Sequence, residues 1–223
     1  MFALTDADLQ SHILGCGDGP ASFNAVLTTR GGRIVSVDPL YRFSQDDIRE
    51  QIRRTCTEVL EQTRQNAHEF LWTNIKSVEE LGRLRLAAME EFLVDYPRGV
   101  AEKRYVDGGL PRLPFSDRSF DLALCSHLLF LYSEHLSEDF HVESIQELCR
   151  VAGEVRVFPL LELGSRKSRH VQAVSMRLAA AGYAVTIETV PYEFQRGGNQ
   201  MMRVYDKHQK CGLEASRRLF HSE

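Results

Sequence analysis

The sequence lacks an apolar run long enough to cross a membrane. Its longest apolar stretch, residues 122–132, is interrupted by Ser126 and His127, whereas a spanning helix needs roughly 18 or more apolar residues. A signal peptide is missing too, because Asp6 and Asp8 stand where a basic segment and an apolar core would be required. We therefore expect no membrane crossing and a cytoplasmic location.

Paired cysteines with metal-site spacing are also absent. The five cysteines are an odd number and form no CxxC pair; they are Cys16, Cys56, Cys125, Cys149 and Cys211. This pattern is typical of reduced thiols, so we expect no disulfide. His135, His141 and their acidic neighbours match no ligand spacing either, and we expect no metal site.

The sequence also lacks an excess of positive charge. Lys and Arg number 27 against 31 Asp and Glu, a net charge of −4, which disfavours nucleic acid and anionic membranes as partners. Hydrophobic residues make up 43% and charged residues 26% of the 223 residues, values of a chain that folds. The length suits one domain with an additional inserted or appended element.

The first recognisable unit is strand, loop, helix and strand. Ile13 and Leu14 lie in a short predicted strand, a helix is predicted over residues 20–29 before Gly31, and a second strand covers residues 33–38. Parallel strands connected in this way are buried on both faces. The pattern predicts an α/β fold.

Residues 43–98 have the pattern of helices throughout. Ser44 and Ser77 each precede an acidic residue by three positions, as in a capping box, and Pro97 and Gly99 are expected to end the second helix. A crossover between two parallel strands needs only one helix, and two are predicted here. We therefore predict an inserted helical cap, with long surface helices as the alternative.

The alternation of strands and helices resumes after the cap. Strands are expected over residues 101–106, 120–125, 154–158, 183–190 and 200–206, and helices over 137–153 and 168–181, with Gly153 ending the first of these helices. The last two strands form a hairpin whose loop contains Gly197. We assign residues 1–42 and 99–206 to the core and 207–223 to a C-terminal tail.

The loop after the first strand is the most informative segment. Gly15, Gly17 and Gly19 let the backbone bend sharply and approach a ligand, although a plain tight turn is the alternative. Asp38, at the end of the next strand, is placed to accept hydrogen bonds from ribose hydroxyls. Pro20 stands where a GxGxxG dinucleotide loop needs its third glycine. The loop predicts a nucleotide-like ligand without a pyrophosphate.

These segments resemble the class I S-adenosylmethionine-dependent methyltransferases. Residues 14–19 read LGCGDG, like the first motif of that family, and residues 34–38 read IVSVD, like the second. Residues 106–121, with LPFSDRSFD at their end, are similar to the third and fourth motif region. The resemblance implies a Rossmann-like, seven-stranded, mostly parallel sheet with helices on both faces, and S-adenosylmethionine as cofactor. The helical insertion after the second strand, residues 43–98, has no counterpart in this resemblance.

The candidate cofactor-binding residues come from the resemblance and from positions that follow the strands. They are Gly15, Cys16, Gly17, Asp18, Gly19, Asp38, Pro39, Tyr41, Asp107, Gly108, Ser126 and His127. Tyr41 would line the adenosine pocket, with ordinary packing as the alternative. By this resemblance Asp107 contacts the adenine. Members of the family often carry an acid two positions before the first glycine, where this chain has Ile13. Asp18 or a backbone carbonyl would then have to contact the ammonium group of the cofactor.

Candidates for the chemistry follow the later strands. His127, whose ordinary pKa near 6.5 suits a general base, and Tyr132 are catalytic candidates, with packing roles as the alternative. Arg166 and Arg196 are candidates for holding an anionic acceptor, unless they are merely solvent-facing charges. No Asp/Asn-Pro-Pro-aromatic tetrad follows the fourth strand, which disfavours methylation of nucleic-acid bases.

The sequence therefore predicts an S-adenosylmethionine-dependent methyltransferase that acts on a small molecule, with an anionic acceptor as a hypothesis and residues 43–98 closing over it. One alternative is a module that binds the cofactor or a partner without catalysis. A second alternative is an NAD-dependent oxidoreductase, which Pro20 disfavours. No oligomeric state is predicted.

Overall fold

A computed structural model describes residues 1–207, so Cys211 and nearly all of the expected tail lie outside the described residues. The helices are α1 (Asp6–Gln10), α2 (Phe23–Thr29), α3 (Gln45–Gln65), α4 (Val78–Ala101), α5 (Glu138–Val151) and α6 (Val171–Ala180), with 3-10 turns η1 (Pro39–Arg42) and η2 (Ala67–Glu69). The strands are β1 (His12–Cys16), β2 (Arg33–Val37), β3 (Tyr105–Val106), β4 (Phe120–Ser126), β5 (Ala152–Phe158), β6 (Leu161–Glu162), β7 (Arg166–Lys167), β8 (Tyr183–Thr189) and β9 (Gln200–Asp206).

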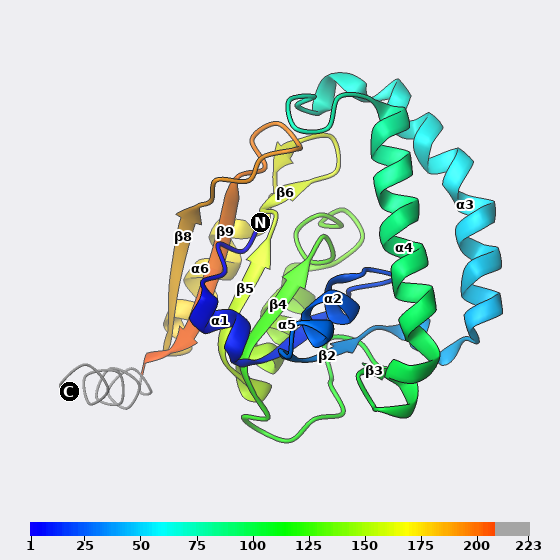
Figure 1. Ribbon diagram of the computed structural model, residues 1–223. Helices are drawn as coiled ribbons and strands as arrows, with labels where there is room; N and C mark the ends of the chain where they lie inside the picture. Colours follow the sequence, from blue (N-terminus) through cyan, green and yellow to red (C-terminus); the bar gives the residue numbers. More distant parts are fainter. Residues whose placement is uncertain (208–223) are drawn as a thin grey trace, which may run out of the picture.

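Seven of these strands form one sheet in the order β3-β2-β1-β4-β5-β9-β8 (Figure 1). Neighbouring strands are parallel except where β9 runs antiparallel to β5 and β8. The chain leaves β1 toward one edge of the sheet and returns to β4 on the other side. This order confirms the Rossmann-like fold of class I methyltransferases and places the switch point between β1 and β4.

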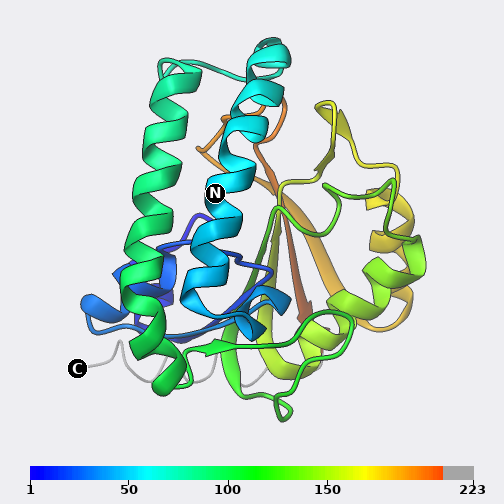
Figure 2. The ribbon, with the colours of Figure 1, turned by 90° about the vertical axis from the view of Figure 1, so that its right-hand side faces the viewer.

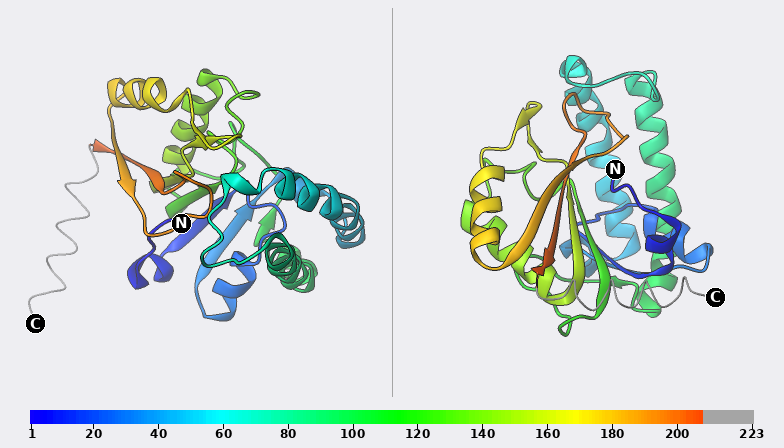
Figure 3. Two further views of the ribbon diagram at one scale, coloured as in Figure 1. Left: turned by 90° about the horizontal axis from the view of Figure 1, so that it is seen from above. Right: turned by 90° about the vertical axis from the view of Figure 1, so that its left-hand side faces the viewer.

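Helices cover both faces of the sheet, as predicted. Viewed from above, α5 and α6 lie on one face, and α1, α2 and α4 lie on the other (Figure 3). The central strands are apolar on both sides; Leu122, Ala123, Leu124 and Cys125 are all buried. Consecutive buried residues are what a parallel strand between two helical layers requires.

The end of α4 differs from the prediction, because neither Pro97 nor Gly99 terminates it. A proline cannot donate to the carbonyl four residues earlier, and here the side-chain amide of Gln45 donates to that Leu93 carbonyl at 2.6 Å instead. A Cβ at position 99 would overlap the ring of Tyr105. Gly99 therefore allows α4 to approach β3 closely, and the expected strand over residues 101–106 shortens to two residues.

Gly153 was also wrongly predicted to be a helix terminator. Helix α5 ends at Val151, and β5 begins at once with Ala152. A Cβ on Gly153 would lie 3.2 Å from the carbonyl oxygen of Asp121 on the neighbouring strand. The glycine therefore serves the close pairing of β5 with β4. The short β6–β7 hairpin was not predicted at all.

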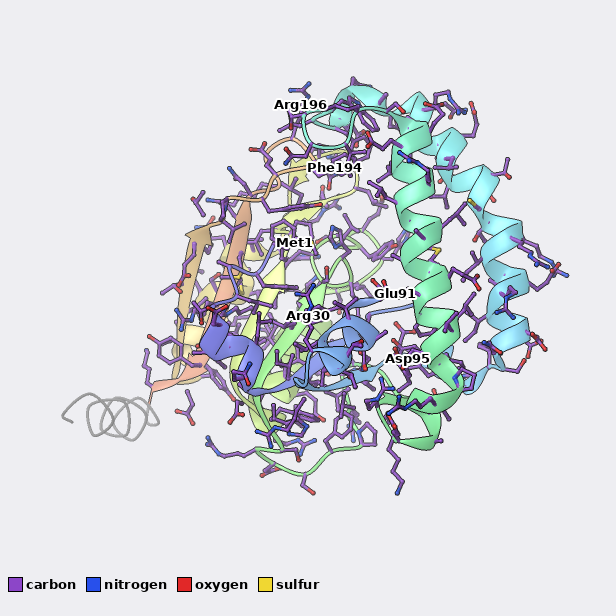
Figure 4. The ribbon with its side chains drawn as sticks, in the orientation of Figure 1. Met1, Arg30, Glu91, Asp95, Phe194 and Arg196 are labelled. Atoms are coloured by element: carbon purple, nitrogen blue, oxygen red, sulfur yellow. The ribbon has the colours of Figure 1, made fainter. Side chains whose placement is uncertain are left out.

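Residues 43–98 form a pair of long antiparallel helices, α3 and α4, beside the β3 edge of the sheet (Figure 2). Both expected N-caps are present, since the Ser44 and Ser77 hydroxyls accept backbone N–H groups three residues later. Arg104 anchors the lower end of α4, where Figure 4 labels Asp95: its guanidinium forms two hydrogen bonds, of 2.7 and 2.8 Å, with the Asp95 carboxylate. It also donates to Asn24 of α2 at 2.7 Å, which holds the pair against the sheet.

Candidate functional site

The glycine loop leaves the carboxyl end of β1 at the switch point. Gly17 and Gly19 have positive φ angles of 70° and 57°, which favour glycine. A Cβ on Gly17 would lie 2.6 Å from a methyl carbon of Leu128, whereas nothing lies within 4 Å of one on Gly19. The backbone is therefore packed on one side at Gly17 and open at Gly19, where a ligand can approach it.

Asp38 holds this loop in place from the end of β2. Its carboxylate accepts the N–H of Gly19 at 2.9 Å and the N–H of Leu40 at 2.8 Å. A carboxylate has about four lone-pair sites, so two backbone bonds leave capacity for the hydroxyls of a ribose. The structure thus places the predicted acid directly beside the loop that it was predicted to serve.

Asp18 turns inward, toward Gly15, where a Cβ would overlap its carboxylate. The Ser36 hydroxyl donates to it at 2.6 Å. Burial, and after it the charge of Asp38, raise the pKa of Asp18 to about 6, although the Ser36 hydrogen bond acts in the opposite direction. Ile13, which replaces the acid often found two positions before the loop, is fully buried in an apolar cluster.

Tyr41 lies in η1, immediately after Asp38 and Pro39. Its hydroxyl donates to the carbonyl of Gly19 at 2.8 Å, while its ring packs against Phe92 and Tyr105 with centroids 6.0 and 5.2 Å apart. Burial raises the pKa of Tyr41 well above its ordinary value, so the phenol keeps its proton and remains a donor. Tyr41 thus connects the loop with α4.

Asp107 and Gly108 follow β3, next to the end of β2. The backbone N–H of Asp38 donates to the Val106 carbonyl at 3.2 Å. Asp38 and Asp107 therefore lie at the carboxyl ends of two adjacent strands, β2 and β3. Asp107 is half exposed and pairs with Arg42 at 3.3 Å. A Cβ on Gly108 would lie 3.0 Å from a methyl carbon of Val37, which explains a glycine there.

His127 follows β4 in a strained conformation, with a φ of 54°. Its N–H donates to the Phe158 carbonyl at 2.8 Å, and its Nδ1 lies 2.7 Å from the Ser126 hydroxyl. Burial, then the positive charges of Arg85 and of the amino terminus, lower the pKa of His127. The imidazole is therefore neutral at pH 7 and able to accept a proton. Backbone strain of this kind is found preferentially at functional sites.

The remaining catalytic and acceptor candidates are Tyr132, Arg166 and Arg196. Tyr132 is 40% exposed on the loop after β4. Arg166 pairs with Glu162 at 3.3 Å, and the Nε of Arg196 donates to the His68 carbonyl at 2.8 Å. These contacts account for both arginines without a ligand. Their role in holding an acceptor stays a prediction.

The segment between α3 and α4 docks on the loop between β8 and β9. The N–H of Leu71 donates to the Phe194 carbonyl at 2.7 Å, and the N–H of Arg196 donates to the Glu69 carbonyl at 2.8 Å. The Phe194 ring lies 5.0 Å from that of Phe70 and 5.5 Å from that of Trp72. Figures 3 and 4 show this contact at the top of the molecule.

We call α3, α4 and the docked segment 66–77 the arch. The arch begins after β2 and contacts the loop that follows β8. These two strands lie on opposite sides of the switch point. The arch therefore crosses the carboxyl edge of the sheet, above the glycine loop. Phe70, Trp72 and Phe194 were not predicted to have a role; large aromatic residues in two loops are the signal that could have indicated a loop–loop contact.

No group of three His, Cys, Asp or Glu side chains within residues 1–207 could hold a metal ion. His141 has a structural role: its Nε2 accepts the Phe130 N–H at 3.0 Å, and its Nδ1 lies 2.7 Å from the Ser137 carbonyl. In the same described part of the chain, no helix is long and apolar enough to cross a membrane.

The chain is similar to several known proteins. No protein-family model matches the chain. An uncharacterized protein of Methanocaldococcus jannaschii is 32% identical over 203 residues, which are 91% of this chain and 89% of that protein. A SAM-dependent methyltransferase from Aquifex aeolicus is 15% identical, with 88% of this chain and 81% of that chain covered and a TM-score of 0.43. Magnesium protoporphyrin IX methyltransferase from Synechocystis is 11% identical, with 91% and 73% covered and a TM-score of 0.47. Because these sequence identities and TM-scores are low, the fold assignment rests on the strand order of the sheet.

Proposed function

This chain belongs to one family with the uncharacterized protein of Methanocaldococcus jannaschii, and we propose that it is an S-adenosylmethionine-dependent methyltransferase acting on a small molecule. One observation carries the proposal. The glycine loop is open at Gly19 and is tied to Asp38 at the switch point of the sheet, where ligands of open α/β sheets bind.

The residues around the loop fit the cofactor. Gly19 leaves room for a ligand beside the backbone, Asp38 retains acceptor capacity for ribose hydroxyls, and Asp107 is half exposed beside it. Asp107 would then contact the adenine. The ammonium group would be bound by a backbone carbonyl of the loop, because Ile13 is apolar and Asp18 is turned inward onto Ser36.

Bound S-adenosylmethionine supplies a methyl group on a positively charged sulfur, which transfers to a nucleophile as the carbon–sulfur bond breaks and its electron pair stays on sulfur. The protein has to align the acceptor and remove a proton where the acceptor carries one. In the tautomer whose Nδ1–H donates to Ser126, Nε2 of His127 is free to accept that proton. Its neutral state at pH 7 suits this role.

The arch supports a small acceptor. Its docked segment crosses the carboxyl edge of the sheet. The hydrogen bonds of the Leu71 and Arg196 N–H groups attach this segment to the loop between β8 and β9. Because the arch occupies this edge of the sheet, we infer that a small molecule fits the site better than a folded protein or a nucleic-acid duplex does.

Calorimetry with S-adenosylhomocysteine, the demethylated product, tests the proposal. We expect binding to the wild-type protein and an affinity at least about tenfold weaker for Asp38→Asn, since an amide cannot accept both backbone N–H groups and the ribose hydroxyls. Asp121→Asn is the matched control, because Asp121 accepts the His12 N–H at 2.8 Å at the amino end of β1. Absence of binding to the folded wild-type protein would overturn the proposal.

Incubation with radiolabelled S-adenosylmethionine and a pooled library of hydroxyl-, amino- and thiol-bearing metabolites separates catalysis from binding alone. Label in a small-molecule product supports a methyltransferase. Tight binding of the cofactor without any labelled product would favour the alternative, a module that binds the cofactor without transfer; the absence of an acid at Ile13 is the feature in its favour.

A further inference from the structure

Three aromatic side chains from distant segments surround the ring of Phe158, which lies at the carboxyl end of β5. Their ring centroids lie 5.8 to 6.2 Å from that of Phe158, at interplanar angles of 69 to 72°, so each pair meets edge to face. The three are Phe2 from the amino-terminal segment, His127 from the loop after β4, and Tyr192 from the loop between β8 and β9. We call these residues, together with Phe158, the aromatic cluster.

The aromatic cluster begins beside the glycine loop and leads away from it along the carboxyl edge of the sheet. A Cβ on Gly17 would lie 2.6 Å from a methyl carbon of Leu128, the residue that follows His127. The strands β1, β4 and β5 are neighbours in that order, with β9 and β8 beyond them. The glycine loop follows β1, His127 follows β4, Phe158 ends β5, and Tyr192 follows β8. His127 therefore lies between the glycine loop and the other rings of the cluster.

The amino-terminal segment covers Phe158 and is anchored to β5 by Arg156. This arginine is 6% exposed, and its guanidinium donates to the Phe2 carbonyl at 2.9 Å. Figures 3 and 4 show the amino terminus beside the loop between β8 and β9. Phe158 is consequently only 2% exposed, whereas Tyr192 is 37% exposed and His127 also retains exposed surface. A ligand can therefore contact the aromatic cluster at Tyr192 and at His127.

We propose that the methyl acceptor is an aromatic compound whose ring packs on Tyr192 while its hydroxyl, amino or thiol group faces His127. This inference rests on the proposed function and names the substrate class of that same site. Since Tyr192 and His127 both contact Phe158, a molecule of one or two fused rings can touch both. An aromatic acceptor extends the ring contacts that the cluster already contains, which an aliphatic compound of the same size cannot do.

Binding and proton transfer fall to different residues in this arrangement. Tyr192 binds the ring of the acceptor, and His127, which is nearer to the glycine loop, takes up the proton. With a phenol, the oxygen forms a bond to the methyl carbon and the carbon–sulfur bond breaks, its electron pair remaining on sulfur. The phenolic proton moves to Nε2 of His127. Loss of the Tyr192 ring should therefore weaken binding of the acceptor and leave the base in place.

Saturation-transfer NMR tests the inference without relying on turnover. The protein is first saturated with S-adenosylhomocysteine, and phenol and its aliphatic counterpart cyclohexanol are then titrated separately. We expect the wild-type protein to bind phenol at least about fivefold more tightly than cyclohexanol. Tyr192→Leu should bring the two affinities to within about twofold of each other, whereas Tyr192→Phe keeps the ring and should keep the preference.

Phe43→Leu is the control, because Phe43 is also an exposed aromatic residue and lies at the base of the arch. It should preserve the preference for phenol. Equal binding of the two probes by the wild-type protein, absence of phenol binding, or a preference that survives Tyr192→Leu would each overturn the inference. Nuclear Overhauser contacts between phenol and the Tyr192 ring in the wild-type protein give a second measurement that needs no variant, and their absence would overturn it as well.

Calorimetry of Tyr192→Leu with S-adenosylhomocysteine separates the acceptor from the cofactor. Unchanged affinity supports a role toward the acceptor. A loss of affinity for S-adenosylhomocysteine as large as the loss for phenol would assign Tyr192 to the cofactor and overturn the inference. Failure of the wild-type protein to bind S-adenosylhomocysteine would instead refute the proposed function.

Discussion

The hydroxyl of Tyr41 donates a hydrogen bond of 2.8 Å to the carbonyl of Gly19. This bond joins the two parts of the candidate site, because Gly19 belongs to the glycine loop and the Tyr41 ring packs on Phe92 of the arch. The shape of the loop therefore depends on the arch being in place. A glycine loop alone would have more freedom than a ligand site requires.

Tyr41→Phe tests this connection, because it keeps the ring and removes only the hydrogen bond. We expect a loss of about 1 kcal/mol in the free energy of unfolding and a weaker affinity for S-adenosylhomocysteine, measured by urea denaturation and calorimetry. Tyr96→Phe is the control: its hydroxyl donates to the Tyr41 and Phe43 carbonyls, at 3.0 Å each. It should lower stability without changing affinity. Equal effects of both variants on affinity would contradict a specific role for Tyr41.

Phe194→Ala should loosen the docked end of the arch. The substitution removes the ring that contacts both Phe70 and Trp72. We expect the amides of Leu71 and Arg196 to exchange hydrogen at least about tenfold faster, while amides of the central strands keep their protection. Phe43→Ala, at the base of the arch where Phe43 is 51% exposed, serves as the control. Unchanged exchange at Leu71 and Arg196 would show that the aromatic contact does not hold the segment.

Asp18→Asn should change how stability depends on pH. The pKa of Asp18 is raised from 3.8 to about 6 in the folded protein, so above pH 6 the fold carries a charge that it disfavours. As the pH falls from 6 to 4, the folded wild-type protein takes up this proton before the unfolded chain does, and its stability rises relative to the variant. The variant should gain about 2–3 kcal/mol relative to wild type at pH 7, and this advantage should vanish near pH 4. Urea denaturation across this range measures it, and parallel pH profiles would be the contrary result.

Thiol labelling tests the packing of α3 on α4. Cys16, Cys125 and Cys149 are buried, and burial raises the pKa of Cys125 and of Cys149 to about 12. Cys56 is half-buried in the groove between α3 and α4. In a Cys211→Ser background we expect one thiol to react with a disulfide reagent in the native protein and four after denaturation. Reaction of a second thiol before unfolding would show that the core is more open than described.

Local signals in the sequence predicted several features correctly. The glycine loop, the acid after β2 and the two serine caps each depend on residues a few positions apart, and the structure shows them where they were expected. The roles of Pro97 and Gly153 were predicted wrongly, because they depend on residues far away in the sequence. Gln45 replaces the N–H that Pro97 lacks, and the neighbouring strand demands the glycine at 153. Both partners are distant in the sequence.

The sequence by itself determined the order of the seven strands of the main sheet and of the helices that connect them, and the turn at residues 15–19, because hydrophobic period, caps and positive φ angles act over a few residues. Only the tertiary structure decided that the helices after β2 form an arch and that Phe70 packs against Phe194. Such contacts join segments whose separation along the chain carries no periodic signal, and they form only once the packed sheet has brought those segments together.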